Sequence, residues 1–263
     1  MTQRTPDVRV DTGKPHPARI YDCLLGGKDH YAVDEEMAAR LPQDAFRDAR
    51  LNRAFMHRAM RWLARHGIDQ FLDIGTGIPT EPNLHQIVQG VNPRCRVAYT
   101  DNDPIVLRHA EALLVSTPEG ATDYIQADVR RPAEVLAHAR AFLDFDRPLA
   151  LSLVALLHFI PDDEDADGVV RTLVDALPSG SHLVLTHGTG DFHPELAGRA
   201  TGDYGKGGIR LALRSHAEVL RFFAGLDLVD PGLVTAPAWH QDTDAPAPRA
   251  EESSIYVGVA RVP

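Results

Sequence analysis

The chain has 263 residues, of which 44% are hydrophobic and 24% charged, and its formal net charge is −10. This size and composition are typical of one folded α/β unit with additions. The acidic balance argues against a general nucleic-acid-binding surface. No apolar run reaches membrane-spanning length, no signal sequence is evident, and the two cysteines lack metal-ligand spacing. We therefore expect a cytoplasmic protein with reduced thiols and no membrane partner.

The first 66 residues predict a mobile arm followed by a helical cap. The arm is polar and contains prolines. Helical patterns follow over residues 19–25 and 33–41, and the strongest amphipathic pattern covers residues 50–66. We expect this N-terminal segment, residues 1–66, to pack on a core formed by residues 67–263.

The core is organised around one glycine-rich turn. The apolar run 71–74 suits a buried parallel strand, and Gly75 and Gly77 follow it at once. Such a turn lets the backbone pass close to a ligand. Pro79 stands where a dinucleotide site has its third glycine, and it has no N–H to offer a pyrophosphate. Asp73 would repel a pyrophosphate but attract an ammonium group, so a nucleoside carrying an amino acid fits better than NAD.

The segment Asp73-Ile74-Gly75-Thr76-Gly77 resembles the first motif of class I S-adenosylmethionine (SAM)-dependent methyltransferases. The resemblance implies that Asp73, Gly75, Thr76 and Gly77 bind the cofactor. It also implies an α/β fold with a Rossmann-like sheet, mainly parallel, with an antiparallel last strand. From the residues alone, an ordinary tight turn remains the alternative.

A second predicted strand, residues 95–100, ends at Asp101, Asn102 and Asp103. A carboxylate at this tip can accept hydrogen bonds from both hydroxyls of a ribose. Asp103 precedes Pro104 and is better placed to cap the next helix. We therefore assign Asp101, together with Asn102, to cofactor binding, with helix capping by all the acids as the alternative.

A third predicted strand, residues 122–126, leads to Asp128 and Val129. This segment is similar to the class I site in which an Asp accepts a hydrogen bond from the adenine amino group and the next residue packs on the ring. The alternative for Asp128 is an N-cap of the following helix. Three acidic strand ends in order, Asp73, Asp101 and Asp128, are hard to attribute to capping alone.

The most apolar run, residues 149–157, predicts the central strand of the sheet. His158 follows it, in a segment similar to one that lies under the methyl group in the wider superfamily. Imidazole titrates near neutral pH, so His158 is the candidate general base, and a structural role bonded to the backbone is the alternative. The acidic run 162–165 predicts a helix start in solvent, and we expect no metal site.

The C-terminal third predicts a fifth strand over residues 182–186 and a last pair over residues 225–234 and 253–260. A glycine-rich polar segment, about 190–212, comes before the last pair and predicts a lid-like insertion or an insertion at the acceptor site. The stretch between the last two strands contains Trp239 but is rich in Ala, Pro and Asp, which predicts an exposed loop.

The stretch 18–29, Ala-Arg-Ile-Tyr-Asp-Cys-Leu-Leu-Gly-Gly-Lys-Asp, is more distinctive than the glycine turn. It resembles the opening of an actinobacterial, DUF574-like family of SAM-dependent methyltransferases, formerly catalogued as a domain of unknown function. His30 stands where that family usually has Asn. Residues 52–55, Asn-Arg-Ala-Phe, are also similar to the family, and the resemblance covers nearly the whole chain.

Within this stretch, Tyr21 and Lys28 are candidate cofactor-binding residues. In this interpretation the segment is a flap, Tyr21 presents an apolar ring with a polar tip, and Lys28 meets the methionine carboxylate. The alternative is that Tyr21 and Tyr31 pack in the core while Lys28 is a solvated charge.

Together these features predict a SAM-dependent methyltransferase that acts on a small-molecule acceptor and releases S-adenosylhomocysteine. The cofactor carries the activated methyl group, so the protein chiefly aligns two partners and excludes water. The alternative is a SAM-binding sensor or partner protein without chemistry.

Overall fold

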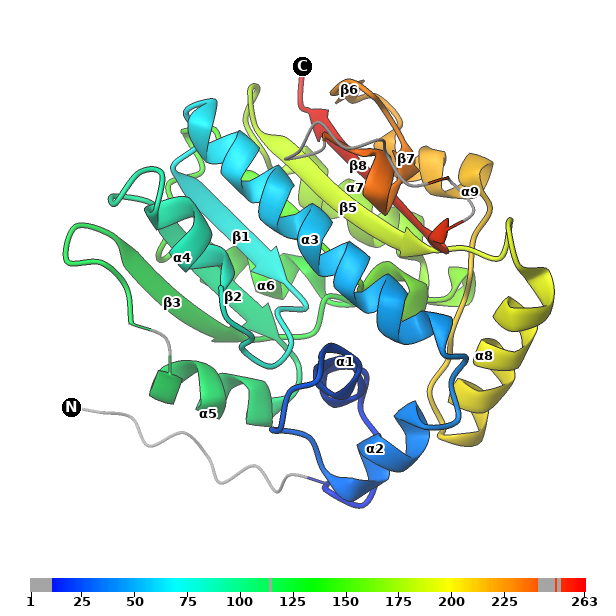
Figure 1. Ribbon diagram of the computed structural model, residues 1–263. Coiled ribbons are helices and arrows are strands. Elements are labelled where there is room, and N and C mark those ends of the chain that lie inside the picture. The colour runs from blue at the N-terminus through cyan, green and yellow to red at the C-terminus, as the bar shows by residue number, and fades with distance from the viewer. Residues whose placement is uncertain (1–10, 114, 241–248, 250–251) are drawn as a thin grey trace.

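The computed structural model describes residues 11–113, 115–240, 249 and 252–263, and its centre is one mixed β-sheet. The strands are β1 Gln70–Ile74, β2 Arg96–Asp101, β3 Ala121–Gln126, β4 Ala150–Leu153, β5 His182–Gly188, β6 Asp227–Leu228, β7 Val234–Thr235 and β8 Ile255–Arg261. Their order is β3-β2-β1-β4-β5-β8-β6, and β7 also pairs with β8 (Figure 1). Strands β1 to β5 pair in parallel and β8 runs antiparallel to β5. The predicted mainly parallel sheet with an antiparallel last strand is therefore confirmed.

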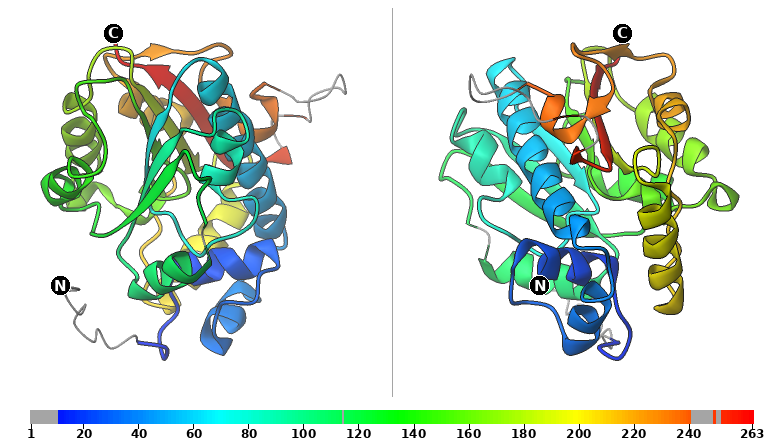
Figure 2. Two further views of the ribbon diagram at one scale, coloured as in Figure 1. Left: turned by 90° about the vertical axis from the view of Figure 1, so that its left-hand side faces the viewer. Right: turned by 45° about the vertical axis from the view of Figure 1, so that its right-hand side comes forward.

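Helices cover both faces of the sheet and its carboxyl edge. The α-helices are α1 Pro17–Leu25, α2 Ala32–Ala38, α3 Asp44–Arg65, α4 Leu84–Gln89, α5 Pro104–Leu113, α6 Pro132–Ala139, α7 Ala166–Asp175, α8 Pro194–Lys206 and α9 His216–Leu220. The short 3₁₀ turns are η1 Leu157–Phe159, η2 Asp162–Glu164, η3 Arg221–Phe223 and η4 Ala236–Ala238. Helices α3 and α4 lie on one face, and α6 and α7 on the other (Figures 1 and 2). Helices α1, α2 and α8 lie beyond the strand ends (Figure 1). Among the described helices, none combines the length and apolarity that a membrane span requires.

The alternation of side chains along β1 explains why the sheet needs helices on both faces. Phe71 packs into the cluster that contains Phe55 of α3, whereas Leu72 packs into the cluster of α6 and α7. Successive strand residues point to opposite faces, so an uninterrupted apolar run must be covered twice. The amphipathic helix α3 supplies much of one cover, and it begins at Asp44, earlier than the predicted start at residue 50.

The central strand is shorter than predicted. Strand β4 ends at Leu153, and the chain turns at Ala155, where φ is 55°, before the 3₁₀ turn η1. The N–H of Ala155 donates to Thr186 Oγ1 at 2.8 Å, which ties this turn to β5. A short apolar run has the same composition in a strand and in a buried turn, so the sequence pattern could not locate this end.

The C-terminal segments also differ from the prediction. The expected exposed loop is wrong at its start, because Trp239 is fully buried with its ring edge-on to Phe55, 5.3 Å between centroids. Arg58 donates to the carbonyl oxygens of Ala236 and Trp239. The lid-like segment is largely helical, since α8 occupies most of it. The arm at 1–10 and most of the remaining loop, 241–248 and 250–251, lie outside the described residues.

Candidate functional site

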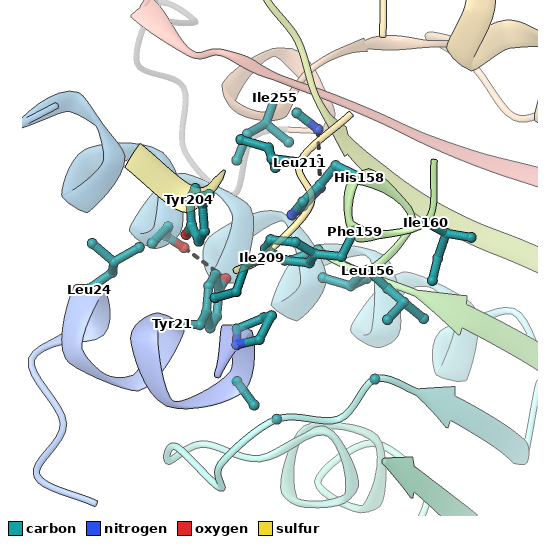
Figure 3. A pocket seen from close by; sticks show the side chains of 18 of the residues that line it. Tyr21, Leu24, Leu156, His158, Phe159, Ile160, Tyr204, Ile209, Leu211 and Ile255 are labelled. Carbon is teal, nitrogen blue, oxygen red and sulfur yellow. Dashed lines mark hydrogen bonds between the residues drawn. The ribbon is translucent and has the colours of Figure 1, made fainter. Parts of the chain in front are cut away.

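One cavity lies at the carboxyl ends of the parallel strands, and it has a volume of about 570 Å³. This is within the usual range for small-molecule sites. Figure 3 shows that its walls come from separate elements, with Tyr21 of α1 near Phe159 of η1 and Tyr204 of α8. The rings of Phe159 and Tyr204 meet edge to face at 5.6 Å. The cavity therefore joins the edge of the sheet to the N-terminal helices.

The glycine turn after β1 forms one wall of the cavity. Gly75 and Gly77 have φ values of 76° and 68°, in the left-handed region that favours glycine. The N–H groups of Gly75 and Thr76 donate to the carbonyl oxygen of Thr100, at 2.8 and 3.2 Å. A Cβ at Gly77 would meet nothing within 4 Å, whereas one at Gly75 would lie 2.8 Å from Leu156 Cδ1. Gly77 thus leaves free space at the wall, while Gly75 allows the loop after β4 to approach.

Asp73 lies at the end of β1 and lines the cavity. Burial raises the pKa of Asp73 to about 6, although the nearby hydroxyl of Ser152, the charge of Arg53 and the nearby hydroxyl of Thr76 lower it. At neutral pH the carboxylate is therefore mostly ionised but poorly hydrated. A cation placed beside it would stabilise the ionised form.

Asp101 and Asp103 have different surroundings, as the sequence predicts. Asp101 lines the cavity, and its Oδ2 accepts a hydrogen bond from the N–H of Gly77 at 2.9 Å. Asp103 caps α5 instead, since its Oδ1 accepts from the N–H of Ile105 at 2.9 Å. Its other oxygen lies 3.4 Å from the guanidinium of Arg19. Carboxylate oxygens have more than one acceptor position, so Asp101 can still accept from a ligand.

Asp128 and Val129 also line the cavity, together with Asn102. The Oδ1 atom of Asp128 accepts a hydrogen bond from the N–H of Arg130 at 2.9 Å, within its own turn. The alternative role of Asp128 as the N-cap of α6 is wrong, because Arg131 occupies that position. The carboxylates at the ends of β1 and β2 and after β3 therefore all line the cavity.

His158 also lines the cavity, in η1 after β4. Its Nδ1 accepts a hydrogen bond from the N–H of Gly188 at 3.4 Å, so the proton of the neutral ring is on Nε2. Burial lowers the pKa of His158 to about 4, and the charge of Arg214 lowers it further. The ring is thus neutral at physiological pH and carries a donor on the nitrogen that is turned away from Gly188 (Figure 3).

A buried guanidinium group holds the loop that carries His158. Arg214 is 3% exposed and donates to the carbonyl oxygens of Leu157 and Ile160, at 3.1 and 2.9 Å. It also donates to Asp162 Oδ1 at 2.6 Å. The acidic run that was expected only to start a helix therefore also anchors this loop. Sequence reasoning missed Arg214, because a single arginine after a polar segment carries no local signal.

The two N-terminal candidates lie in different surroundings. Tyr21 lines the cavity, and its hydroxyl donates to the carbonyl oxygen of Ala49 at 3.1 Å and accepts from Asn52 Nδ2 at 2.9 Å. Lys28 is exposed and is not among the residues that line the cavity. The structure therefore brings Tyr21, but not Lys28, to the predicted site.

The glycine pair beside Lys28 serves the fold of its own segment. Gly26 ends α1 with φ of 82°. A Cβ at Gly27 would lie only 1.9 Å from Asp22 Oδ1, so this position requires glycine. The same carboxylate accepts hydrogen bonds from the N–H of Asp29 at 3.1 Å and from His30 Nδ1 at 2.8 Å. Gly27 therefore allows its backbone to lie against the Asp22 side chain.

Arg53 is a cavity-lining cation that sequence reasoning did not single out. It lies on α3 and donates to the carbonyl oxygens of Thr80 and Pro82. Burial lowers the pKa of Arg53, while the nearby hydroxyl of Tyr21 and carboxylate of Asp73 raise it. Its place in the stretch 52–55, which resembles the DUF574-like family, is the signal that could have found it.

Comparison with known protein families assigns the chain to one of them. A family described as S-adenosyl methyltransferase matches residues 3–263. The chain belongs to this family. It is therefore a SAM-dependent methyltransferase, and SAM is its cofactor. No curated protein matches the sequence. Among the described residues, no group of three or more His, Cys, Asp or Glu side chains is arranged to hold a metal ion.

Solved structures support the same assignment for this methyltransferase. It is 47% identical to a DUF574 family protein from Streptomyces avermitilis, with a TM-score of 0.93 over 97% of this chain and 100% of the other. It is 36% identical to a putative methyltransferase from Thermobifida fusca, with a TM-score of 0.87 over 99% of both chains. The N-methyltransferase NodS from Bradyrhizobium japonicum, crystallised with S-adenosylhomocysteine, is 14% identical at a TM-score of 0.50 over 93% of this chain and 99% of that one, and shares the fold.

Proposed function

We propose that this methyltransferase transfers the methyl group of SAM to a small, largely apolar acceptor bound in the same cavity. The observation that carries the proposal is the mixed lining of the cavity. Its carboxylates Asp73, Asp101 and Asp128 lie at the ends of β1 and β2 and after β3, whereas apolar side chains come from α1, η1 and α8. A polar, cationic cofactor suits the carboxylates, which we call the cofactor side, and an apolar molecule suits the apolar lining, which we call the acceptor side.

On the cofactor side, each carboxylate has a partner of suitable chemistry. We assign Asp73 to the amino group of SAM, Asp101 and Asn102 to the ribose hydroxyls, and Asp128 to the adenine amino group, with Val129 against the ring. The free space beside Gly77 supports the fit, because a side chain there would fill it. Gly75 and Thr76 shape the same wall through their bonds to β2.

The carboxylate of SAM needs a cation, and we assign Arg53 to it. Arg53 lines the cavity and senses the charge of Asp73, which we assign to the neighbouring amino group. The exposed Lys28 would have to move to reach the cavity. A guanidinium group can also bind a carboxylate through two parallel hydrogen bonds, which lysine cannot do.

SAM supplies an activated methyl group, so the residues of the chain need to align the acceptor and exclude water. The aromatic rings of Tyr21, Phe159 and Tyr204 provide a dry surface on the acceptor side. His158, with its proton on Nε2, donates a hydrogen bond to a polar atom of the acceptor. It therefore orients the acceptor in this tautomer, whereas the base role would require the proton on Nδ1. The products are the methylated acceptor and S-adenosylhomocysteine.

Calorimetry with SAM tests the cofactor side of the proposal. We expect Arg53→Gln to weaken SAM binding by about 1.5–3 kcal/mol, the usual range for a hydrogen bond to a charged group. Lys28→Gln is the matched control and should keep the affinity of the unaltered chain. Equal losses in the two variants would contradict the assignment of Arg53.

Turnover tests the acceptor side. The chain is incubated with methyl-labelled SAM and an actinobacterial metabolite extract, and products are separated by mass. A labelled small molecule that depends on the chain is expected. If SAM binds but label never leaves it for a small molecule, the proposed transfer is wrong and a sensor role is favoured.

A further inference from the structure

One buried carboxylate in the cavity has no assigned role. Asp48 lies on α3, is 8% exposed and lines the cavity. Its Oδ1 accepts one hydrogen bond, from the N–H of Ser254 at 3.2 Å. Within the described part of the chain, no basic side chain forms an ion pair with it. A buried carboxylate is costly without a cationic partner, so this position suggests that a ligand provides one.

The sheet topology places Asp48 on the acceptor side of the cavity. Ser254 comes immediately before β8, whose first residue, Ile255, pairs with Gly188 of β5. The N–H of Gly188 in turn donates to His158. Asp48 and His158 therefore flank one pair of strand ends. The cofactor-side carboxylates lie at the ends of β1 and β2 and after β3, on the other side of β4 in the sheet order.

The charges of the cavity wall also favour a cationic acceptor. Six carboxylates and three guanidinium groups line the cavity. Two of the three, Arg130 and Arg210, already pair with carboxylates, among them Glu164, which both contact. SAM itself brings only one net positive charge, so negative charge remains in excess when it is bound.

Asp48 is mostly ionised at neutral pH, although its surroundings raise its pKa. Burial raises the pKa of Asp48 to about 6, and the charge of Asp44 raises it too. The bonds from Ser254 and the charge of Arg47 act in the opposite direction. A cation bound here would be attracted by the negative charge of Asp48, and this attraction is stronger because the site is poorly hydrated.

We propose that Asp48 binds a protonated amino group of the acceptor, so that the acceptor is an apolar molecule that carries an amine. This inference rests on the proposed function, because it concerns the acceptor side of the same cavity. The rings of Tyr21, Phe159 and Tyr204 would surround the apolar part of such a molecule, and aromatic faces also attract cations. The amine is a recognition group, and the proposal leaves the methylated atom unassigned.

The test measures binding of matched compounds to the chain saturated with S-adenosylhomocysteine. Each set shares one frame and differs only in its polar end: phenethylamine, phenethyl alcohol and hydrocinnamate form one set, and tryptamine, tryptophol and indolepropionate form another. We expect the amines to bind at least about tenfold more tightly than the alcohols, because an ammonium group forms a buried ion pair with Asp48. The acids should bind most weakly, because their carboxylate is repelled by Asp48. Asp48→Asn should remove this preference while its amide oxygen still accepts from Ser254. In the unaltered chain the preference should fade below pH 6.

Asp44→Asn is the matched control. Asp44 lies on the same helix and also lines the cavity, but it is 38% exposed and 3.5 Å from Arg47. This variant should keep the preference for amines. The inference is overturned if amines show no preference, if no amine binds at millimolar concentration, or if Asp48→Asn retains the preference. SAM affinity is also measured for each protein. If the unaltered chain does not bind SAM, the proposed function is refuted, and not only this inference.

Discussion

The two sides of the cavity are built in different ways. On the proposed cofactor side, Asp73 and Asp101 lie at the ends of β1 and β2, where the pairing of parallel strands holds them in place, and Asp128 follows β3. On the acceptor side, the walls come from α1, α3, η1, α8 and β8. The first side is part of the sheet, whereas the second depends on how helices pack against it. This difference lets one fold keep its cofactor while the acceptor changes.

The N-terminal helices show what holds the acceptor side together. Ile20 and Leu24 of α1 are buried with Met37 of α2. Arg19 is 4% exposed and lies between the carboxylates of Asp34 and Asp103, at 3.6 and 3.4 Å. Asp103 also caps α5, which packs on β2 and β3, so this buried cluster joins the helical cap to the cofactor side. The two sides are thus distinct in construction but mechanically linked.

The largest expected effect concerns the glycine turn. Gly77→Val should lower SAM affinity by more than about a hundredfold, because its side chain would enter the free space at the cavity wall. Calorimetry measures the loss. Gly67→Val is the matched control, since Gly67 also has a left-handed φ, 90°, and free space around it but does not line the cavity. Both variants should lose similar folding stability, and only Gly77→Val should lose SAM. Retained SAM binding in a folded Gly77→Val protein would show that this glycine serves only the turn.

A smaller effect is expected at the end of β2. Asp101→Ala should weaken SAM binding by about 1–3 kcal/mol, because two ribose hydroxyls would lose a charged acceptor. Asp103→Ala should instead lower the free energy of unfolding by about 0.5–2 kcal/mol through loss of the cap on α5. Calorimetry and denaturant titration measure the two quantities. If Asp103→Ala weakened SAM more than Asp101→Ala, the assignment of the two acids would have to be reversed.

The smallest effect is a pH dependence. The raised pKa of Asp73, about 6, means that acidification below pH 6 protonates the carboxylate that we assign to the amino group of SAM. SAM affinity should therefore fall by about tenfold in all as the pH is lowered from 7 to 5. Asp73→Asn should bind SAM more weakly at pH 7 and show a shallower dependence. Burial raises the pKa of Asp101 as well, so some dependence should remain. An unchanged slope in Asp73→Asn would contradict the role of Asp73.

The carboxylates of Asp48 and Asp73 also affect folding stability, but their contribution increases as the pH is lowered. Burial raises the pKa values of Asp48 and Asp73 in the folded chain to about 6. The folded state therefore binds more protons than the unfolded state between the ordinary carboxyl pKa and pH 6. These two groups stabilise the ligand-free fold most at low pH, and this contribution is lost as the pH rises through 6. Maintaining such groups ionised at neutral pH is a cost that bound cations would offset.

Much of the cavity wall at the ends of β1, β2 and β3 could be predicted because its signals are local. An apolar run, two glycines and an acid directly after a strand define both the turn and its position at the sheet edge. The prediction of Asp101 over Asp103 followed from Pro104, which marks a helix start. Two predictions are wrong because composition is ambiguous there: the apolar run 149–157 predicts an end of β4 that is too late, and the stretch rich in Ala, Pro and Asp predicts an exposed Trp239.

The sequence was sufficient for the fold class, the order of the strand-end acids and the identity of the cofactor, since each depends on residues that are neighbours in the chain. The tertiary structure alone decided the acceptor side. Asp48 meets Ser254 across 206 positions of sequence, and Arg214 reaches the loop of His158 from beyond α8. The tertiary structure also leaves Lys28 in solvent and brings Arg53 to the cavity. Such contacts arise from the packing of α3, α8 and β8 around the sheet, and packing over these separations leaves no pattern in a local stretch of sequence.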